Sequence, residues 1–168
     1  MIEILDNVLN ENELNDIKNY LMSFNFPWYF LDAKVKKDQS TLCSDFNNYQ
    51  FCHMFYSDDK THQYTSQYFS ILSPLIQKIN PRSISRIKAN LTMRSDVIES
   101  YSYHTDTDFN CKTSIFYLNT NNGCTIFESG EKINSIENRM ITFDSQLKHT
   151  GTTTTDQKFR LVLNFNYF

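Results

Sequence analysis

The spacing of apolar residues predicts two amphipathic helices in the first half of the chain. The first is expected over residues 11–24, where Asn10 and Glu13 have the spacing of a capping box at the helix start. The second is expected over residues 66–80, with Ser73 as the N-cap and a proline in the first turn. The predicted buried stripe of the first helix consists of Leu14, Ile17, Leu21 and Phe24. Stripes of this kind are typical of helices that pack on a hydrophobic core.

From residue 86 onward, alternation of apolar and polar residues predicts β-strands, with turn-forming Asn, Gly and Ser between them. The expected strands are 86–91, 115–119, 125–127, 139–143 and 159–168. In the last strand, one face consists of Leu161, Leu163, Phe165 and Tyr167, and the other of Arg160, Val162, Asn164 and Asn166. An arginine and two asparagines are costly in a packed core, but they suit the inner wall of a small barrel that holds a polar ligand.

Length and composition narrow the class of protein. A chain of 168 residues is most simply one domain. The net charge of −3 and the pI of about 5.8 give no general affinity for polyanions, so a nucleic-acid partner is not favoured. The four cysteines have no C-x-x-C spacing, and we expect free thiols in a reducing cytoplasm. No signal-like start or long apolar stretch predicts secretion or a membrane span. With only three glycines, asparagine is expected to supply turn conformations.

One group of residues predicts metal chemistry. His104 and Asp106 are two positions apart, and His149 follows far downstream. Two imidazoles and one carboxylate on one face of a metal are diagnostic of non-haem Fe(II) oxygenases, and residues i and i+2 of a strand share a face. Asp108 is an alternative carboxylate ligand, although Asp106 keeps the better spacing. Arg160, eleven residues after His149, offers a guanidinium that can grip a carboxylate, so the set predicts Fe(II) and 2-oxoglutarate.

The segment 104–167 resembles the catalytic core of Fe(II)/2-oxoglutarate-dependent dioxygenases, in the prolyl 4-hydroxylase-like branch. The matching elements are His104-Thr105-Asp106, Tyr117-Leu118-Asn119, residues 123–127, residues 138–143, His149 and Arg160. The chain is also similar to small uncharacterised dioxygenases encoded by tailed bacteriophages, in which a segment like 86–91 precedes the His-x-Asp strand. The resemblance covers the second half of the chain well and the first half loosely.

The resemblance implies a catalytic set of His104, Asp106, His149 and Arg160, with the first three as iron ligands. Arg160 would bind the distal carboxylate of 2-oxoglutarate, and the Tyr117 hydroxyl would donate a hydrogen bond to the same carboxylate. Asn90 and Asn164 are further candidates for contact with the co-substrate. Many relatives carry Tyr-Pro before the His-x-Asp motif, whereas this chain has Leu91-Thr92-Met93, so whether Asn90 or Thr92 contacts the co-substrate is left open.

The fold that the resemblance implies is mainly β with flanking helices: a double-stranded β-helix, or jelly-roll barrel of cupin type. Residues 1–85 would be helical and loop support, and residues 86–168 the jelly-roll core. The implied reaction hydroxylates a C–H bond with O2 and releases succinate and CO2. Whether ascorbate is also required is left open. We expect a protein or peptide side chain, or a small molecule, as substrate. The alternatives are a nucleic-acid demethylase and a non-catalytic cupin-like binding protein. Oligomeric state and the roles of residues 31–64, His53 and His62 are left open, with a structural or surface role favoured for both histidines.

Overall fold

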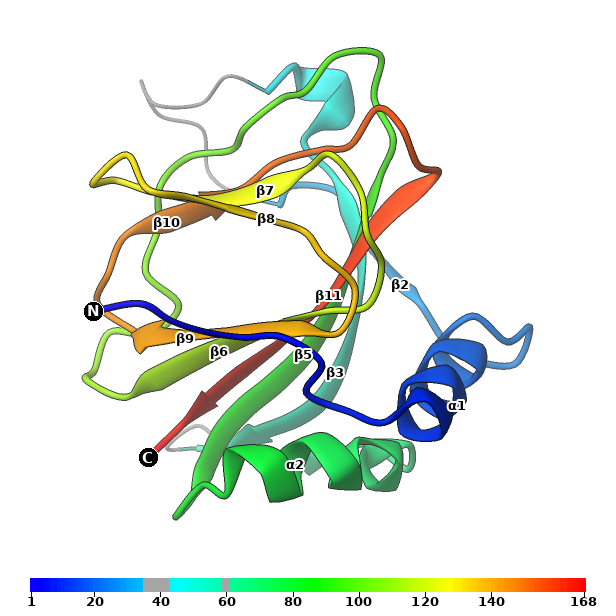
Figure 1. The fold of residues 1–168 in the computed structure, drawn as a ribbon, viewed down its shortest axis with the longest axis vertical. Helices are drawn as coiled ribbons and strands as arrows, with labels where there is room; N and C mark the ends of the chain where they lie inside the picture. Colours follow the sequence, from blue (N-terminus) through cyan, green and yellow to red (C-terminus); the bar gives the residue numbers. More distant parts are fainter. Residues whose placement is uncertain (35–42, 59–60) are drawn as a thin grey trace.

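The computed structural model describes residues 1–34, 43–58 and 61–168 (Figure 1). In these residues the larger sheet is antiparallel and runs in the order β1-β9-β6-β11-β5-β3-β2, with β4 paired to β3. Its strands are β1 (Glu3–Leu5), β2 (Tyr29–Leu31), β3 (Gln50–Asp58), β4 (Gln63–Thr65), β5 (Ile84–Met93), β6 (Lys112–Tyr117), β9 (Arg139–Asp144) and β11 (Phe159–Tyr167). The smaller sheet has the order β10-β7-β8, formed by β7 (Cys124–Phe127), β8 (Lys132–Asn134) and β10 (His149–Gly151).

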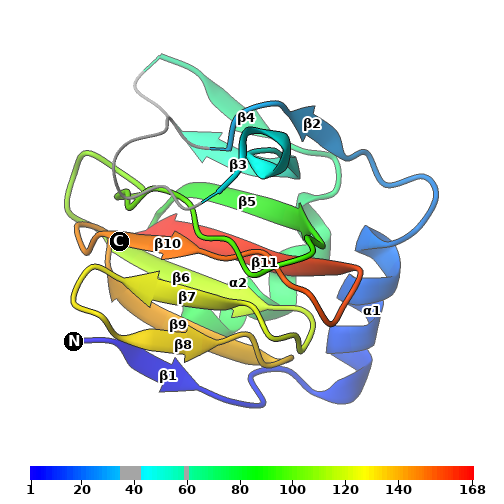
Figure 2. The same ribbon diagram turned by 90° about the horizontal axis from the view of Figure 1, so that it is seen from above.

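The elements form three layers. Figures 1 and 2 show the smaller sheet lying over one face of the larger sheet, with α1 (Glu11–Leu21) and α2 (Ser73–Ile79) against the opposite face. Two short 3-10 helices, η1 (Asp45–Asn47) and η2 (Phe69–Leu72), complete the described elements. Two antiparallel sheets packed face to face are the arrangement of a jelly roll. The predicted fold class, mainly β with flanking helices, is therefore confirmed.

The outer core lies between the helices and the larger sheet. Leu14, Ile17 and Leu21 of α1 are buried there with Leu75 of α2. The sheet contributes the apolar faces of β5, β6 and β11, including Ile87, Ala89, Leu91, Phe116, Leu161, Leu163 and Phe165. Each fully buried aliphatic or aromatic side chain adds roughly 1.5–3 kcal/mol relative to an exposed one. The predicted apolar face of the last strand is thus the face that carries the helices.

The start of α1 is as predicted, but its end is not. The Asn10 side chain accepts from the Glu13 backbone N–H, and the Glu13 carboxylate accepts from the Asn10 N–H, which completes the capping box. The helix ends at Leu21, so Phe24 falls in the following turn and is fully exposed. The second helix also begins differently, because the 3-10 turn η2 runs directly into α2. Ser73 is therefore already helical, and its hydroxyl donates to the Ser70 carbonyl instead of capping a free end.

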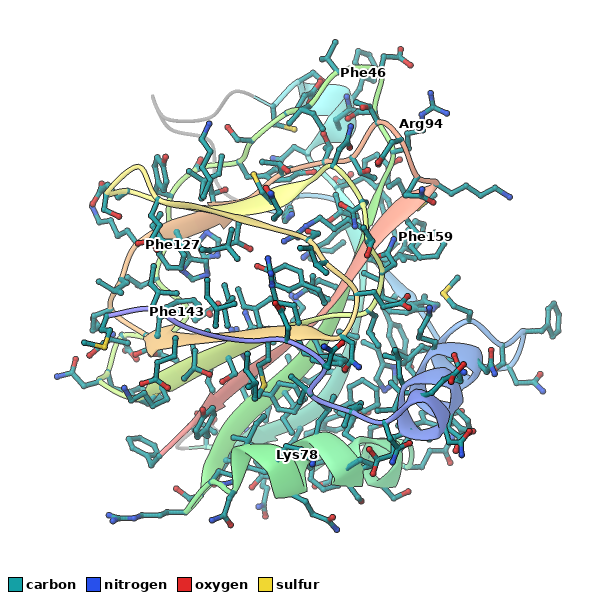
Figure 3. The ribbon with its side chains drawn as sticks, viewed as in Figure 1. Phe46, Lys78, Arg94, Phe127, Phe143 and Phe159 are labelled. Atoms are coloured by element: carbon teal, nitrogen blue, oxygen red, sulfur yellow. The ribbon has the colours of Figure 1, made fainter. Side chains whose placement is uncertain are left out.

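The inner core lies between the two sheets. Tyr117, Ile141 and Val162 from the larger sheet pack there with Phe127 and Ile133 from the smaller sheet. Phe127 and Phe143 meet edge to face with ring centroids 4.9 Å apart, and Figure 3 shows them between the layers. This cluster fills the side of the barrel around β6 and β9. The side around β5 and β3 is lined by polar residues instead, and it contains the cavity described below.

The first half of the chain does more than the helical and loop support that the sequence predicted. Strands β1 to β4 all belong to the larger sheet, and the expected boundary between residues 85 and 86 falls inside β5. β3 pairs with β5 along most of its length. Its sequence mixes aromatic and polar residues on both faces, because one face meets the helices and the other meets the cavity. The period-2 signal that identified later strands is therefore weak there.

Turn geometry follows the prediction for asparagine. In the described part of the chain every non-glycine residue with positive φ is an asparagine, at Asn7, Asn80 and Asn138. Asn80 ends α2 in the left-handed conformation, and its N–H donates to the Ile76 carbonyl. Asparagine tolerates this region better than other side chains with a Cβ.

Among the described helices, none has the length and apolar character needed to span a membrane.

Candidate metal and co-substrate site

His104, Asp106 and His149 converge on one point of the cavity. Their ligand atoms all lie within 4.8 Å of one another, close enough to hold a single metal ion. His149 begins β10, and His104 lies opposite it in an isolated antiparallel bridge. Asp108 is exposed and is not part of this cluster, so the structure places Asp106 as the carboxylate of the group.

The segment around His104 is not the regular strand that the sequence predicted. Outside the bridges at Ser100 and His104, residues 99–106 pair with no strand, and Tyr103 and Thr105 also line the cavity. A regular strand would turn these neighbours away from the cavity. The extended backbone still brings His104 and Asp106 to the same side, so the expected juxtaposition holds without the expected element.

Both imidazoles are oriented by backbone carbonyls two residues earlier in the chain. His104 Nδ1 lies 3.2 Å from the Ser102 oxygen, and His149 Nδ1 lies 3.0 Å from the Leu147 oxygen. A carbonyl can only accept, so each Nδ1 carries the proton and donates it. Nε2 of each ring is then left with a lone pair for a metal. Second-shell bonds of this kind fix the tautomer of metal-binding histidines.

Asp106 is buried and held by two donors. Arg86 Nη2 donates to Oδ1 and Asn164 Nδ2 donates to Oδ2, both at 3.0 Å, and His149 Nε2 lies 3.7 Å from Oδ2. Burial raises the pKa of this carboxyl, but His149, Arg86 and the Asn164 hydrogen bond outweigh burial and lower it below its usual value. Burial, reinforced by His149, also lowers the pKa of His104. An ionised carboxylate with neutral imidazoles is the donor set that a divalent iron requires.

The cavity beside this cluster has a volume of about 460 Å³. Small-molecule sites fall roughly between 300 and 1,000 Å³. Along β11 the inward-facing residues are Asn164, Val162 and Arg160, all of which line the cavity. Asn164 contacts Asp106, and Arg160 lies four residues further along the strand. That separation is roughly 14 Å at about 3.4 Å per residue, and both side chains reach into the space between. The metal cluster and the guanidinium therefore lie toward opposite ends of one cavity.

Arg160 is buried with an exposed fraction of only 4%. Its Nε donates to Ser135 Oγ at 2.8 Å and its Nη2 to Thr125 Oγ1 at 3.0 Å. Burial lowers the pKa of its guanidinium. No aspartate or glutamate among the described residues pairs with it, and hydroxyls alone do not neutralise its charge. A buried cation is strongly disfavoured without an anion, so the guanidinium is suited to receive one from a ligand.

Tyr117 lies next to Arg160 but does not line the cavity, which corrects the expectation that its hydroxyl faces the co-substrate. The ring is fully buried, the Arg160 guanidinium carbon is 5.5 Å from its centroid, and its hydroxyl donates to Thr125 Oγ1 at 2.8 Å. Thr125 does line the cavity. Its oxygen accepts from both Tyr117 and Arg160, which occupies both lone pairs and leaves its own hydroxyl proton for a ligand. Tyr117 thus acts through Thr125.

No sequence motif pointed to Lys34, the other cation at this end of the cavity. Its Nζ donates to Thr92 Oγ1 at 3.3 Å and lies 3.7 Å from the centre of the Tyr101 ring. A Cβ added at Gly151 would lie 3.2 Å from Arg160 Nη1 and 3.8 Å from Lys34 Nζ, so the two cations flank the same glycine. Burial and the nearby guanidinium lower the pKa of Lys34 well below its usual range. An anion bound here would restore its charge.

Three amide oxygens in the cavity wall have no hydrogen-bond partner: Gln50 Oε1, Asn90 Oδ1 and Asn164 Oδ1. Buried polar atoms are almost always paired, so unpaired ones grouped in one cavity point to a ligand or water. Asn90 and Thr92 both line the cavity, and Thr92 accepts a hydrogen bond from Lys34, so contact of either residue with the co-substrate stays a prediction. His53 does not line the cavity. It is buried elsewhere in the molecule, where its ring nitrogens contact the Pro27 carbonyl and the Ser66 hydroxyl. His62 is exposed.

Comparison with known proteins identifies the fold through structure alone. No protein-family profile matches the chain, and no curated protein sequence matches it. A 2OG-Fe(II) oxygenase family oxidoreductase from Burkholderia pseudomallei has a TM-score of 0.72 at 13% identity, with 99% of this chain and 84% of that chain covered. A prolyl hydroxylase from Trichoplax adhaerens, in complex with a hypoxia inducible factor peptide fragment, has a TM-score of 0.64 at 14% identity over 99% and 83%.

A third similar structure contains ligands. HygX from Streptomyces hygroscopicus, with nickel and 2-oxoglutarate bound, has a TM-score of 0.62 at 10% identity, with 99% of this chain and 82% of that chain covered. These identities establish a common fold and leave activity to be argued from the site. The resemblance inferred from the sequence is confirmed at this level, while the similarity to bacteriophage-encoded members stays a prediction. The chain has the fold of the 2OG-Fe(II) oxygenases.

Proposed function

We propose that this protein is an Fe(II)- and 2-oxoglutarate-dependent dioxygenase that hydroxylates a C–H bond. One observation carries the proposal. One cavity has a His-Asp-His cluster toward one end, and toward the other a buried guanidinium that has no carboxylate partner in the part of the chain that the structure describes. A dicarboxylate that chelates a metal with one end and needs a cation at the other fits this spacing. The donor set, two imidazoles and one carboxylate, is the set used by non-haem iron oxygenases.

Each residue of the site has a defined part in this proposal. His104, Asp106 and His149 hold the iron, and the Arg86 and Asn164 donors keep the carboxylate in place. Arg160 and the Thr125 hydroxyl bind the distal carboxylate of 2-oxoglutarate. When bound, iron and 2-oxoglutarate would activate O2 and insert one oxygen atom into the substrate, with succinate and CO2 as co-products.

Aromatic packing fixes the orientation of the His149 imidazole and shields it from water. The Phe143 ring lies 4.9 Å and the Phe127 ring 5.9 Å from the His149 ring, both measured between centroids. His149 is itself almost fully buried. A ligand whose orientation is fixed before metal binds needs less reorganisation, and the apolar surroundings strengthen electrostatic interactions inside the site.

For the target we propose a protein or peptide side chain. Support comes from the similarity to the Trichoplax adhaerens prolyl hydroxylase, whose structure contains a peptide fragment. The negative net charge of the chain gives no support to a nucleic-acid substrate.

The test is conversion of 2-oxoglutarate to succinate by the purified chain under air, with and without Fe(II). Turnover that requires Fe(II), and that is lost in His149→Ala, is the expected result. Addition of peptide pools should then raise the rate, and mass spectrometry should find a gain of one oxygen atom on the modified peptide. A chain that binds metal and 2-oxoglutarate but releases no succinate under any of these conditions would instead be a binding protein.

A further inference from the structure

The cavity holds more positive charge than iron and 2-oxoglutarate require. Among the described residues, its charged lining consists of one carboxylate, Asp106, and four cations: Lys34, Arg86, Lys88 and Arg160. Arg86 is paired with Asp106. On the proposed function, the two charges of Fe(II) balance the two charges of 2-oxoglutarate. The four cations and one carboxylate of the lining then leave three positive charges in excess when the lysines are protonated, which favours a further anion.

The cations divide between the two ends of the cavity. Lys34 and Arg160 flank Gly151 and belong to the end that would take the distal carboxylate of 2-oxoglutarate. Lys88 is on β5 directly opposite Asn164 of β11, the residue that donates to Asp106. Cβ atoms of residues opposed across antiparallel strands are about 5 Å apart. Lys88 therefore projects from the wall beside the metal cluster.

Lys88 has no partner of its own in the described residues. No hydrogen bond or ion pair joins its ammonium group to another described side chain, although it is half-buried and faces the cavity. Arg86, two residues earlier on the same face, does have partners, in Asp106 and Asn166. Lys88 attracts Asp106 only at longer range and makes no direct bond to it, so its ammonium hydrogens are available to a ligand.

The wall around Lys88 has further unsatisfied groups. Asn90 follows on the same face of β5, and its buried Oδ1 has no partner. Gln50 of β3 is only 3% exposed, and its Oε1 is also without a partner. Leaving a buried polar atom unpaired is costly, so such groups normally meet a ligand or water. A cation and two amides on β3 and β5 form a polar wall that the His-Asp-His cluster and Arg160 do not use.

We propose that the primary substrate carries a carboxylate that pairs with Lys88, with polar groups beside it held by the Asn90 and Gln50 amides. This inference rests on the proposed function. A single ammonium acts as a point charge and suits one carboxylate, whereas a phosphate dianion usually recruits several donors or an arginine fork. The carboxylate could belong to an acidic side chain of a peptide or to a free small acid, which share this chemistry.

The reaction follows from the placement of Lys88 next to the metal cluster. The carbon that is oxidised should lie a few bonds from the bound carboxylate. A C–H bond of the substrate becomes C–OH, and O2 supplies one oxygen atom to that hydroxyl and one to succinate. 2-Oxoglutarate loses CO2 and gives up two electrons as it becomes succinate, the substrate carbon gives up two more, and O2 accepts all four.

The first arm of the test measures binding. Protein loaded with Mn(II) and 2-oxoglutarate without oxygen is titrated with N-acetyl-aspartate, N-acetyl-glutamate and pentapeptides with a central Asp or Glu. The matched amides contain Asn or Gln. We expect the acids to bind at least tenfold more tightly than their amides, and Lys88→Met to weaken the acids roughly ten- to hundredfold while leaving the amides unchanged. Free acids and peptides are separate series, so the tighter series identifies the source of the carboxylate.

The second arm measures succinate release and oxygen gain under air for the same compounds. Lys132→Met, on the exposed face of β8, is the matched control. Lys88→Met should raise the KM for the acid and keep the wild-type affinity for Mn(II) and 2-oxoglutarate. Acids that bind no better than amides, or an equal loss for both in Lys88→Met, would overturn the inference. Absence of iron-dependent succinate in every variant would instead defeat the proposed function, and the binding arm still decides the role of Lys88.

Discussion

His104 and His149 fix each other in register, because the backbone N–H of each donates to the carbonyl of the other at 3.0 Å in both directions. The two imidazoles come from segments far apart in sequence, yet their positions depend on main-chain bonds and not on the metal. The ring centroids lie 4.9 Å apart as a result. A site organised in this way should be present in the metal-free protein and should bind metal without refolding.

Metal binding is the first prediction. The chain should bind about one Fe(II), Mn(II) or Co(II), as expected for a single facial triad. His104→Ala and His149→Ala should lose both metal and turnover while the circular dichroism spectrum stays that of the folded protein. Asp106→Asn should weaken metal binding, and Asp108→Asn should not, because Asp108 is exposed and outside the cluster. The reverse pattern in a metal titration would move the carboxylate ligand to Asp108.

Arg160 is predicted to determine co-substrate affinity. Removing one partner of a buried ion pair costs on the order of 3–5 kcal/mol, which corresponds to a loss of roughly a hundred- to a few-thousand-fold. Arg160→Ala should therefore retain the metal but require far more 2-oxoglutarate for half-maximal succinate release. Arg160→Lys should recover part of the loss, since lysine keeps the charge without the two-pronged geometry. A wild-type requirement for 2-oxoglutarate in Arg160→Ala would show that the anion binds elsewhere.

Thr125 should contribute through its hydroxyl and not through its size. Thr125→Val keeps the shape but leaves the Tyr117 hydroxyl and an Arg160 N–H without an acceptor in a buried site. Unpaired buried donors cost on the order of 1–3 kcal/mol, so the KM for 2-oxoglutarate should rise roughly ten- to hundredfold. Thr125→Ser keeps the hydroxyl and should stay close to wild type. An equal KM for 2-oxoglutarate in the valine and serine variants would show that Tyr117 does not act on the co-substrate through the Thr125 hydroxyl.

His53 makes stability depend on pH. Its Nδ1–H donates to the Pro27 carbonyl and its Nε2 accepts from Ser66, an arrangement that fits a neutral ring. Burial lowers its pKa in the folded state, so between that value and about 6.5 the unfolded chain binds more protons. This contribution is complete above about pH 6.5 and is lost as the pH falls through the folded pKa, with a slope approaching about 1.4 kcal/mol per pH unit.

Urea unfolding at a series of pH values measures this effect. His53→Gln should flatten the acid limb of the stability profile, and His62→Gln, at an exposed position, should leave it unchanged. An acid limb of the same slope in His53→Gln would assign the effect to other groups.

The packing of α1 can be tested with two positions three residues apart. Leu21 is fully buried against the sheet, whereas Phe24 lies beyond the helix end and is fully exposed. Leu21→Ala should lower the free energy of unfolding by about 2–5 kcal/mol. Phe24→Ala should change it by less than about 0.5 kcal/mol, as is usual for surface positions. Similar losses at both positions would contradict the observed end of the helix.

The sequence was most informative where one physical requirement acts on a continuous segment. Residues 159–167 lie between two buried layers of different character, so their alternation reports both faces: leucines toward the helices and Arg160 with Asn164 toward the cavity. The strand β3 has no such signal, because aromatic and polar residues occur on both of its faces. Its membership of the sheet depends on pairing with β5, a contact that a single segment does not encode.

The same distinction applies to the site. His104, Asp106 and His149 were predictable because few residue types can bind iron, and their order is informative even when the distance between them is long. Thr125, Lys34 and Gln50 belong to no motif. Each takes part only because the fold brings it to the cavity, and a threonine or lysine in sequence is most often a surface residue. Tyr117 lies beside Arg160, but its hydroxyl donates to Thr125 and does not face the cavity.

β11 is the last strand in chain order and the middle strand of the larger sheet, between β6 and β5. In the described residues, the two halves of that sheet, β1-β9-β6 on one side and β5-β3-β2 on the other, are joined only through β11. During synthesis on the ribosome, neither half can join the other until residues 159–167 have emerged. Such non-local pairing slows folding. The same strand contains Arg160. A chain whose synthesis stops before residue 159 therefore lacks both the central strand of the sheet and the anion-binding residue. We do not expect such a fragment to fold into an inactive protein that still binds iron.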